Sequence, residues 1–502
     1  MTAVKAELVA LCDEALGALG DGEARTALLA VRANLDRPLQ VTVAGGVSSG
    51  KSTLVNALLG QRIAAVDAGE CTRVVTRFTY SHHERAEIVL HDGTSHQLAL
   101  RDGTLPAELG VPVDAVREVV VHLSNRGLEH LAIVDTPGLN TVTAENQAQT
   151  EGFLGLATST KAGRDTAASI GQADALVFLM PHLRQADAAV LGGFRDLYAD
   201  AGLSAFNAVA VLSKIDQLSR TEDPLTAAAP IARRVQEEAR GLVSAVLPVI
   251  GLLAETAACA RLTEDDARAL AALAAFGDDL DREDLLLSPD AFLAHDGAAV
   301  PAAVRQRLLE RLGLHGLGVA LDAIDGGHHG AVALLRVLDG YSGLAPLRRQ
   351  VVDRLGGQAD LLKCHTALCD LRRLSYLPGL GGDDQGVLRS LRSPLDRFEM
   401  DPTLHRLRVA EVLQEATDGT LRLPESLLVD VERLASGLDP AARVGVVDPR
   451  EVADAALRGA ARWGRWANDP RRRPVDARRG RAVKAAYEMI WHTEQRGERR
   501  AG

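Results

Sequence analysis

The chain has 502 residues, of which 47% are hydrophobic and 25% are charged, so it can bury substantial cores and is long enough for two or three domains. Its formal net charge of −11 argues against a general nucleic-acid binder. The five cysteines are odd in number and scattered, and no apolar signal segment precedes them, so we expect a reducing, cytoplasmic location.

The N-terminal residues 1–36 carry leucines and valines at roughly helical spacing, with a break near Gly20–Gly22. We expect neck helices in this region. Between residues 37 and 258, short apolar runs alternate with helical stretches, which predicts an α/β head with a mixed, mostly parallel sheet covered by helices on both faces. The expected strands are Leu39–Ala44, Val75–Tyr80, Ala86–Leu90, Glu118–Leu123, Leu131–Val134, Ala175–Leu179, Ala208–Leu212 and Val246–Ile250.

The first expected strand runs into a glycine-rich loop that matches the phosphate-loop pattern of a P-loop NTPase. The glycines let successive backbone N–H groups turn inward around phosphates, and Lys51 adds charge at the β- and γ-phosphate oxygens. The Ser52 hydroxyl is the expected Mg²⁺ ligand. A helix over Leu54–Leu59 completes the strand-loop-helix context. The predicted phosphate-binding residues are Gly45, Gly46, Val47, Ser48, Ser49, Gly50, Lys51, Ser52 and Thr53.

The strand at Leu131–Val134 ends in the tetrapeptide Asp135-Thr136-Pro137-Gly138. The carboxylate of Asp135 can hold the hydration shell of Mg²⁺, and the N–H of Gly138 can sense the γ-phosphate. By itself this tetrapeptide is a weak signal.

The strand at Ala208–Leu212 ends in Ser213-Lys214-Ile215-Asp216. The Asp216 carboxylate can accept both N–H donors of guanine, a pair that adenine does not offer, and Lys214 can lie across the base. Only six of the 56 basic residues are lysines, and Lys51 and Lys214 are two of them. The ordered set of three motifs therefore predicts a GTPase that binds GTP or GDP with Mg²⁺.

The spacing between the motifs indicates a subclass of GTPase. Lys51 and Asp135 are 84 positions apart, and Asp135 and Asp216 are 81 positions apart. Both intervals exceed what a minimal GTPase requires, so the head is expected to carry insertions and to be a large GTPase.

Beyond residue 258 the strand signals fade, and we predict an all-α neck and trunk over 259–450. One helix is expected from Leu344 to Leu374, about 45 Å long at about 1.5 Å per residue, which would make an extended stalk. The apolar loop Tyr376–Leu380 would lie at its far end. This loop, near 376–384, is either packed against neighbouring helices or a tip that touches a membrane.

The C-terminal residues 451–502 are predicted to form basic neck helices. From Arg458 onward there are 13 arginines and lysines against five acidic residues. The ordinary interpretation is a solvated helix face. The functional interpretation is attraction to anionic lipid or to an acidic partner.

The motifs together resemble the dynamin superfamily, particularly the bacterial dynamin-like proteins. Two further stretches in the head and the helical half are similar to the actinobacterial isoniazid-inducible dynamin-like proteins, in the shorter IniC type. The segments that carry the resemblance are Gly45–Leu59, Cys71–Thr76, Asp135–Gly138, Ser213–Asp216, Leu247–Ala254 and Cys364–Leu368 with Leu371–Arg373.

The resemblance implies roles for residues outside the three motifs. Thr72, or less plausibly Thr76, is the switch residue that closes over Mg²⁺ and the γ-phosphate, so that Thr72 joins the Mg²⁺ ligands Ser52 and Asp135. Ser48 helps to offset charge in the transition state. Ile250 and Gly251 belong to the loop that contacts guanine.

Three positions depart from the family pattern. Ser213 stands where asparagine or threonine is usual, and Ile250 stands where the guanine-contacting loop usually has a small polar residue. Val47 stands where eukaryotic dynamins keep a glutamine that positions water. Turnover is then slow, or another group positions the water. The resemblance implies a homodimer through the GTPase heads or a pair with a dynamin-like paralogue.

The function predicted from the sequence is GTP hydrolysis coupled to membrane remodelling or maintenance, at the cytoplasmic face of the plasma membrane and in peripheral contact with anionic lipid. Two alternatives remain open: a soluble regulatory GTPase switch, and a nucleotide-binding partner subunit with little activity. No nucleic-acid partner is expected.

Overall fold

The computed structural model describes most of the head and nearly all of the helical half. The candidate residues Val47, Thr72 and Gly138 lie outside the described residues, as do Cys71 and part of the loop near 376–384. The described ranges are 3–46, 48–64, 73–100, 103–106, 108–137, 173–181, 207–218, 222–239, 243–276, 279–295, 300–377, 382–399, 401–417, 419–436 and 439–501.

Within these ranges nine strands form one sheet, in the order β4-β3-β5-β2-β6-β1-β7-β8-β9. The strands β6, β1, β7, β8 and β9 run parallel to one another. The β2–β6, β3–β5 and β3–β4 pairs are antiparallel, whereas β2 and β5 are parallel. The strands are β1 (Leu39–Gly45), β2 (Thr76–Tyr80), β3 (Arg85–Leu90), β4 (Ser95–Leu98), β5 (Val116–Leu123), β6 (Leu131–Asp135), β7 (Ala175–Met180), β8 (Ala208–Ser213) and β9 (Ala245–Val249).

The predicted fold class is confirmed: a mixed, mostly parallel sheet with helices, followed by an all-helical region. Strands β1, β6, β7 and β8 are buried at every residue, as expected for parallel strands covered on both faces. Strand β4 was not predicted from the sequence. Its residues are mostly exposed and polar, because it is an edge strand, so it lacks the apolar run that revealed the others.

Two apolar cores lie on the opposite faces of the sheet, since successive strand residues point to opposite sides. Leu176 and Phe178 pack into one core, together with helices α7 to α13. Val177 packs into the other, with α3 and the segment after α13. The helices are α3 (Lys51–Leu59), α7 (Pro224–Glu238), α8 (Gly251–Ala258), α9 (Glu264–Ala274), α10 (Asp279–Leu285), α11 (Pro289–Ala294), α12 (Ala302–Asp325) and α13 (Ala331–Ser342).

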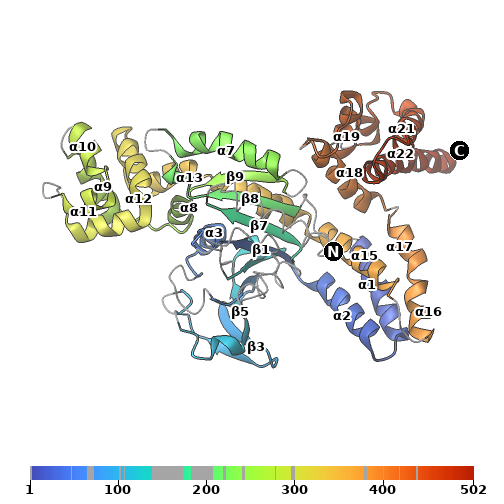
Figure 1. Cartoon of the computed structure of the whole chain (residues 1–502), viewed down its shortest axis with the longest axis horizontal. Helices are drawn as coiled ribbons and strands as arrows, with labels where there is room; N and C mark the ends of the chain where they lie inside the picture. Colours follow the sequence, from blue (N-terminus) through green and yellow to red (C-terminus); the bar gives the residue numbers. More distant parts are fainter. Residues whose placement is uncertain are drawn as a thin grey trace, which may run out of the picture.

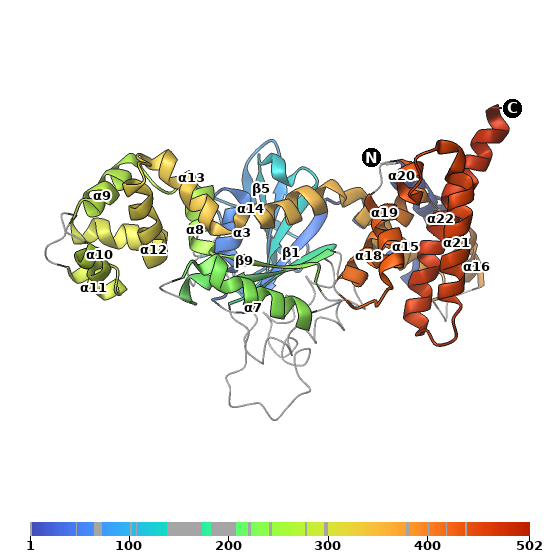
Figure 2. The same cartoon turned by 90° about the horizontal axis from the view of Figure 1, so that it is seen from above.

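The single stalk helix expected over Leu344–Leu374 is interrupted. The structure has α14 (Leu344–Arg348), a π-helical segment η7 (Arg349–Gly356) and then α15 (Ala359–Leu374). The break follows a Gly356-Gly357 pair, which weakens helix propagation. The apolar residues of this region are buried, first against the sheet and then against the N-terminal helices. Figure 2 shows α14 along the head and α15 among the helices beside it.

The N-terminal helices pack with the helices that follow η7 to form a third core. Figure 1 shows this bundle beside the sheet, with the last helices of the chain in a separate group. The bundle contains α1 (Ala3–Ala18), α2 (Glu23–Asp36), α15, α16 (Gly382–Ser390) and α17 (Arg392–Glu399). The C-terminal group contains α18 (Pro402–Thr417), α19 (Glu425–Ser436), α20 (Pro440–Val444), α21 (Val452–Ala467) and α22 (Pro474–Ala501).

Helices α21 and α22 approach each other closely because glycines face aromatic rings. A Cβ on Gly459 would lie 2.5 Å from the ring of Tyr487, and one on Gly480 would lie 2.6 Å from the ring of Trp466. Among the helices that the structure describes, none is both long enough and apolar enough to cross a bilayer. The domain boundaries predicted at 36, 258 and 450 stay proposals, although the packing groups the first 36 residues with 359–399.

Candidate nucleotide-binding site

The phosphate loop joins β1 to α3, and its backbone has the conformations that this turn needs. A Cβ on Gly45 would lie 2.5 Å from the carbonyl oxygen of Leu179, so only glycine fits at the end of β1. Gly50, with φ of 94°, and Ser48, with φ of 58°, lie in the left-handed region. The glycine pattern seen in the sequence thus has a local structural cause at Gly45 and Gly50.

Lys51, Ser52 and Asp135 meet where β6 ends beside the start of α3. Lys51 is 8% exposed, and its ammonium donates to the carbonyl of Gly46 at 2.9 Å. The Ser52 hydroxyl donates to Oδ2 of Asp135 at 2.9 Å. Burial lowers the pKa of Lys51 and raises the pKa of Asp135 to about 6, in each case against the attraction between the two charges. Two residues predicted from motifs 83 positions apart are therefore in direct contact.

The residues at this point fit Mg²⁺. Oδ1 of Asp135 is buried and has no hydrogen-bond partner among the described residues, so one carboxylate oxygen is left over for a further ligand. Hydroxyl and carboxylate oxygens are ligands that Mg²⁺ prefers. Ser52 and Asp135 would hold the ion, whereas Thr72, the third predicted ligand, lies outside the described residues.

A cavity of about 210 Å³ adjoins the phosphate loop and brings together four distant segments of the chain. Its polar wall includes the predicted base reader Asp216 and the predicted base-covering Lys214. The lining residues are Ser49, Gly50, Thr53, Leu54, Leu179, Val211, Ser213, Lys214, Asp216, Gln217, Val249, Gly251 and Leu252. Its place at the carboxyl ends of parallel strands is where open α/β sheets bind ligands.

The base motif is connected directly to the phosphate loop. The hydroxyl of Ser213, which is 5% exposed, donates to the carbonyl of Ser49 at 2.8 Å. Lys214 follows in the left-handed region, with φ of 55°, a conformation that is uncommon for lysine. A serine at position 213 is thus sufficient to hold the two loops together.

Ile250 does not line this cavity. Its side chain is 1% exposed within the core beneath α8, and its N–H donates to the carbonyl of Ser342 at 2.9 Å. Its neighbour Gly251 does line the cavity, as predicted for this loop. An isoleucine at this position therefore anchors the loop instead of contacting a base.

Sequence reasoning missed the apolar walls of the cavity, which include Leu179, Val211 and Leu252. The available signal was their position, since the first two lie in the last half of buried strands and the third lies in the first turn of α8. Helix α12 supports this wall from outside, because Gly313 lies against Leu252 and Gly316 against Leu253. The base end of the site is therefore packed against the helices of residues 259–342.

Comparisons with known proteins cover both halves of the chain. The sequence profile of the Dynamin family matches residues 41–187. The isoniazid-induced protein IniC of Mycobacterium tuberculosis is 32% identical over 477 residues, which span 92% of this chain and 91% of that protein. A bacterial dynamin-like protein of Nostoc punctiforme is 34% identical over 125 residues, or 22% of this chain and 18% of its own. A solved chain from an oligomerised bacterial dynamin pair aligns with 99% of this chain and 75% of its own, at a TM-score of 0.30 and 13% identity.

Proposed function

Since the chain belongs to the dynamin family, we propose that it binds GTP together with Mg²⁺ and hydrolyses the γ-phosphate as a large GTPase. The observation that carries this proposal is the cavity that unites Ser49, Asp216 and Gly251 beside the buried Lys51 and Asp135. A phosphate loop, a carboxylate for guanine and a carboxylate for a metal are the parts that a GTPase requires.

In the proposed reaction, water attacks the γ-phosphate directly and no covalent intermediate forms. Lys51 exchanges the carbonyl of Gly46 for phosphate oxygens, and the loop amides stabilise the same charge. Bound Mg²⁺ neutralises charge on the β- and γ-phosphates. Ser48, Thr72 and Gly138 keep their predicted roles as proposals, namely offsetting transition-state charge, closing over the ion and sensing the γ-phosphate.

The proposal extends to assembly and location. With valine instead of glutamine at position 47, a head-to-head dimer or a paralogous partner would complete the catalytic site. The protein would act peripherally on anionic lipid at the cytoplasmic face of the plasma membrane, in remodelling or maintenance. A soluble regulatory switch and a partner subunit of low activity are the competing functions, and a turnover assay with and without liposomes separates the three.

Replacing Asp216 by Asn tests the guanine assignment. An amide offers only one acceptor and adds a donor, so the variant loses guanine's paired contact and gains one to the carbonyl of xanthine. We expect the preference of Asp216→Asn to move from GTP toward XTP by about tenfold or more, since each lost charged hydrogen bond costs about 1.5–3 kcal/mol. Competition with a fluorescent GDP analogue measures it. ATP that competes as well as GTP in the unaltered protein would overturn the assignment.

A further inference from the structure

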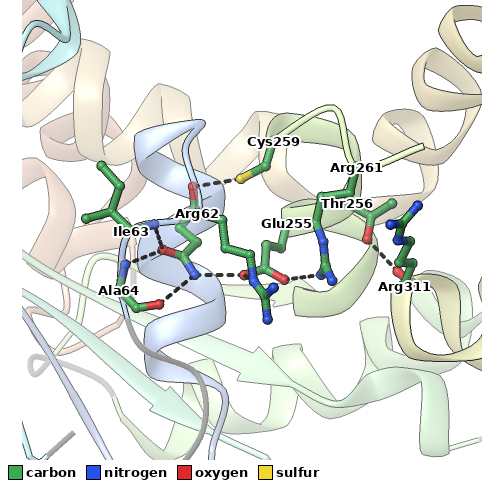
Figure 3. A network of polar contacts seen from close by, with 9 residues as sticks. Arg62, Ile63, Ala64, Glu255, Thr256, Cys259, Arg261 and Arg311 are labelled. Carbon is green, nitrogen blue, oxygen red and sulfur yellow. Dashed lines mark hydrogen bonds and ion pairs between the residues drawn. The ribbon is translucent and has the colours of Figure 1, made fainter. Parts of the chain in front are cut away.

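A buried side-chain network lies at the far end of α3 from the phosphates. Its centre is Asn56, which is fully buried and uses its amide in four hydrogen bonds. Figure 3 shows the partners Ile63, Ala64 and Glu255. The carbonyl oxygen accepts from the N–H groups of Ile63 at 3.0 Å and Ala64 at 2.8 Å. The amide nitrogen donates to the carbonyl of Ala64 at 3.1 Å and to Oε1 of Glu255 at 2.7 Å. An asparagine is satisfied completely by this set.

The second member, Glu255, lies on α8 and is 1% exposed. Its Oε2 accepts from the guanidinium of Arg261 at 2.6 Å, and the guanidinium of Arg62 lies 3.9 Å from Oε1. The buried carboxylate is thus paired with two guanidinium groups. Asn56 therefore shares this carboxylate with the guanidinium of Arg261.

The two side chains connect elements that the proposed reaction must keep in register. Asn56 belongs to the helix that begins with Lys51 and Ser52. Ile63 and Ala64 immediately precede residues 65–72, which end in Thr72. Glu255 belongs to the helix that begins with Gly251 at the base end of the cavity. One asparagine thus fixes the start of the segment that carries Thr72 to both nucleotide-binding helices.

We infer that Asn56 and Glu255 are positioning residues for GTP hydrolysis: they set where the chain that leads to Thr72 leaves α3, relative to the phosphates and the base. This inference rests on the proposed function. The two residues lie outside the lining of the nucleotide cavity, so their loss acts on turnover more than on nucleotide affinity.

Exchanging the carboxylate and the amide between positions 56 and 255 tests the inference. Asn56→Asp keeps the acceptor for the N–H groups of Ile63 and Ala64, loses the donor to the carbonyl of Ala64, and places a second carboxylate against Glu255. The added Glu255→Gln supplies a donor to Asp at position 56 and still accepts from Arg261. We expect kcat to fall by about tenfold or more in Asn56→Asp and to return to within about threefold of the unaltered protein in the double variant, with the Kd for a fluorescent GDP analogue unchanged within about threefold.

A neighbouring residue supplies the matched control. Thr256 is as buried as Glu255 and donates its hydroxyl to the carbonyl of Arg311 on α12, away from Asn56. Thr256→Val removes a hydrogen bond from the same turn of α8 and should leave kcat within about threefold. If Asn56→Asp is not recovered folded, Asn56→Ser removes the amide without adding charge and is expected to show the same loss of kcat.

The possible results separate the inference from its premise. Turnover in Asn56→Asp equal to that of the unaltered protein overturns the positioning role, as does an equal loss in Thr256→Val or a folded double variant that does not recover. An unaltered protein that hydrolyses no GTP overturns the proposed function instead.

Discussion

The carboxyl group of Asp135 is held in an environment that favours its protonated form. Its pKa is raised from 3.8 to about 6, because burial outweighs the attraction of Lys51 and the hydrogen bond from Ser52. A folded-state pKa above the unfolded value means that folding takes up a proton between these pH values. The nucleotide-free protein therefore loses stability as the pH rises from about 4 through 6.

Asp135→Asn is expected to remove this loss. The shift from 3.8 to about 6 corresponds to at most about 3 kcal/mol, so the nucleotide-free variant should unfold at a higher temperature than the unaltered protein at pH 7.5. The difference should shrink as the pH falls toward 4. The same variant should fail to hydrolyse GTP, since an amide is a poor replacement for a carboxylate that holds Mg²⁺.

Thermal unfolding across this pH range, without nucleotide, measures the effect. If the stability of Asp135→Asn had the same pH dependence as that of the unaltered protein, the pKa of Asp135 would not be raised by folding. Retained hydrolysis in Asp135→Asn would contradict the metal-binding role.

At the scale of residues, the sequence predicted what a local pattern encodes. Lys51 and Ser52 are consecutive, and Asp135 and Asp216 each follow an apolar strand, so motif and strand end together locate them. The Asn56–Glu255 contact joins positions 199 apart and follows no short pattern. The core position of Ile250 was also not predictable from the sequence, because the direction of its side chain depends on how α8 packs on the sheet.

At the scale of elements, buried strands were predictable because continuous apolar runs reveal them. The edge strand β4 and the break between η7 and α15 were not. Leu347 and Leu371 were expected on one continuous helix, yet they pack into different cores. Periodicity gives the face of a helix that is buried, whereas the partner that covers this face is a property of the tertiary structure.

Helix α15 is fastened to the sheet by a buried ion pair. The ammonium of Lys363 lies 2.5 Å from Oδ2 of Asp174, just before β7, and both side chains are 1% exposed. Lys363 also donates to Asn34 of α2 at 2.8 Å, and Asp174 accepts from the N–H of Gln40 at 2.8 Å. The ion pair therefore connects helices α15 and α2 of the N-terminal bundle to strand β1 and the start of β7 in the head.

Lys363→Met should destabilise the protein, because it leaves the Asp174 carboxylate buried without its cation. We expect the free energy of unfolding to fall by about 3–5 kcal/mol. The double variant Lys363→Met, Asp174→Asn should recover most of this loss, since neither charge remains. Urea unfolding measures both changes.

An exposed ion pair provides the comparison. Arg268 and Asp265 are paired on α9 with side chains 78% and 76% exposed, so Arg268→Met should have little effect on stability. A Lys363→Met variant as stable as Arg268→Met would mean that the buried pair does not fasten the bundle to the head.

At the scale of the whole molecule, the two proposed membrane contacts differ in the side chains that the structure describes at each. At the tip, Tyr376 is 64% exposed, with the guanidinium of Arg392 3.8 Å above its ring. Leu377 instead packs partly against the bundle core, so it is not free to enter lipid. In the C-terminal group, some arginines are held in ion pairs, such as Arg479 with Glu415. Others are exposed, with no ion pair in the part of the chain that is described; among them are Arg471, Arg478 and Arg481.

The exposed C-terminal arginines are expected to carry most of the attraction to anionic lipid. Each basic residue near a charged membrane surface contributes about 1 kcal/mol, and the contribution is screened by salt. Changing Arg471, Arg478 and Arg481 together to Glu should abolish co-sedimentation with anionic liposomes at low salt. Tyr376→Ser should leave most of the binding in place.

A control with the same change in net charge distinguishes a local surface from general electrostatics. Arg126, Arg233 and Arg336 are also exposed and lie on the head and its flanking helices, so their replacement by Glu should lower binding much less. Equal losses in the two triple variants would mean that overall charge, and not the C-terminal surface, draws the protein to lipid.

Two other results would change the assignment of the membrane contact. If Tyr376→Ser alone abolished binding, the lipid contact would lie at the tip and not at the C-terminal arginines. An unaltered protein that fails to sediment with anionic liposomes at low salt, with or without GTP, would favour the soluble switch. Neither the tip nor the C-terminal arginines would then bind lipid.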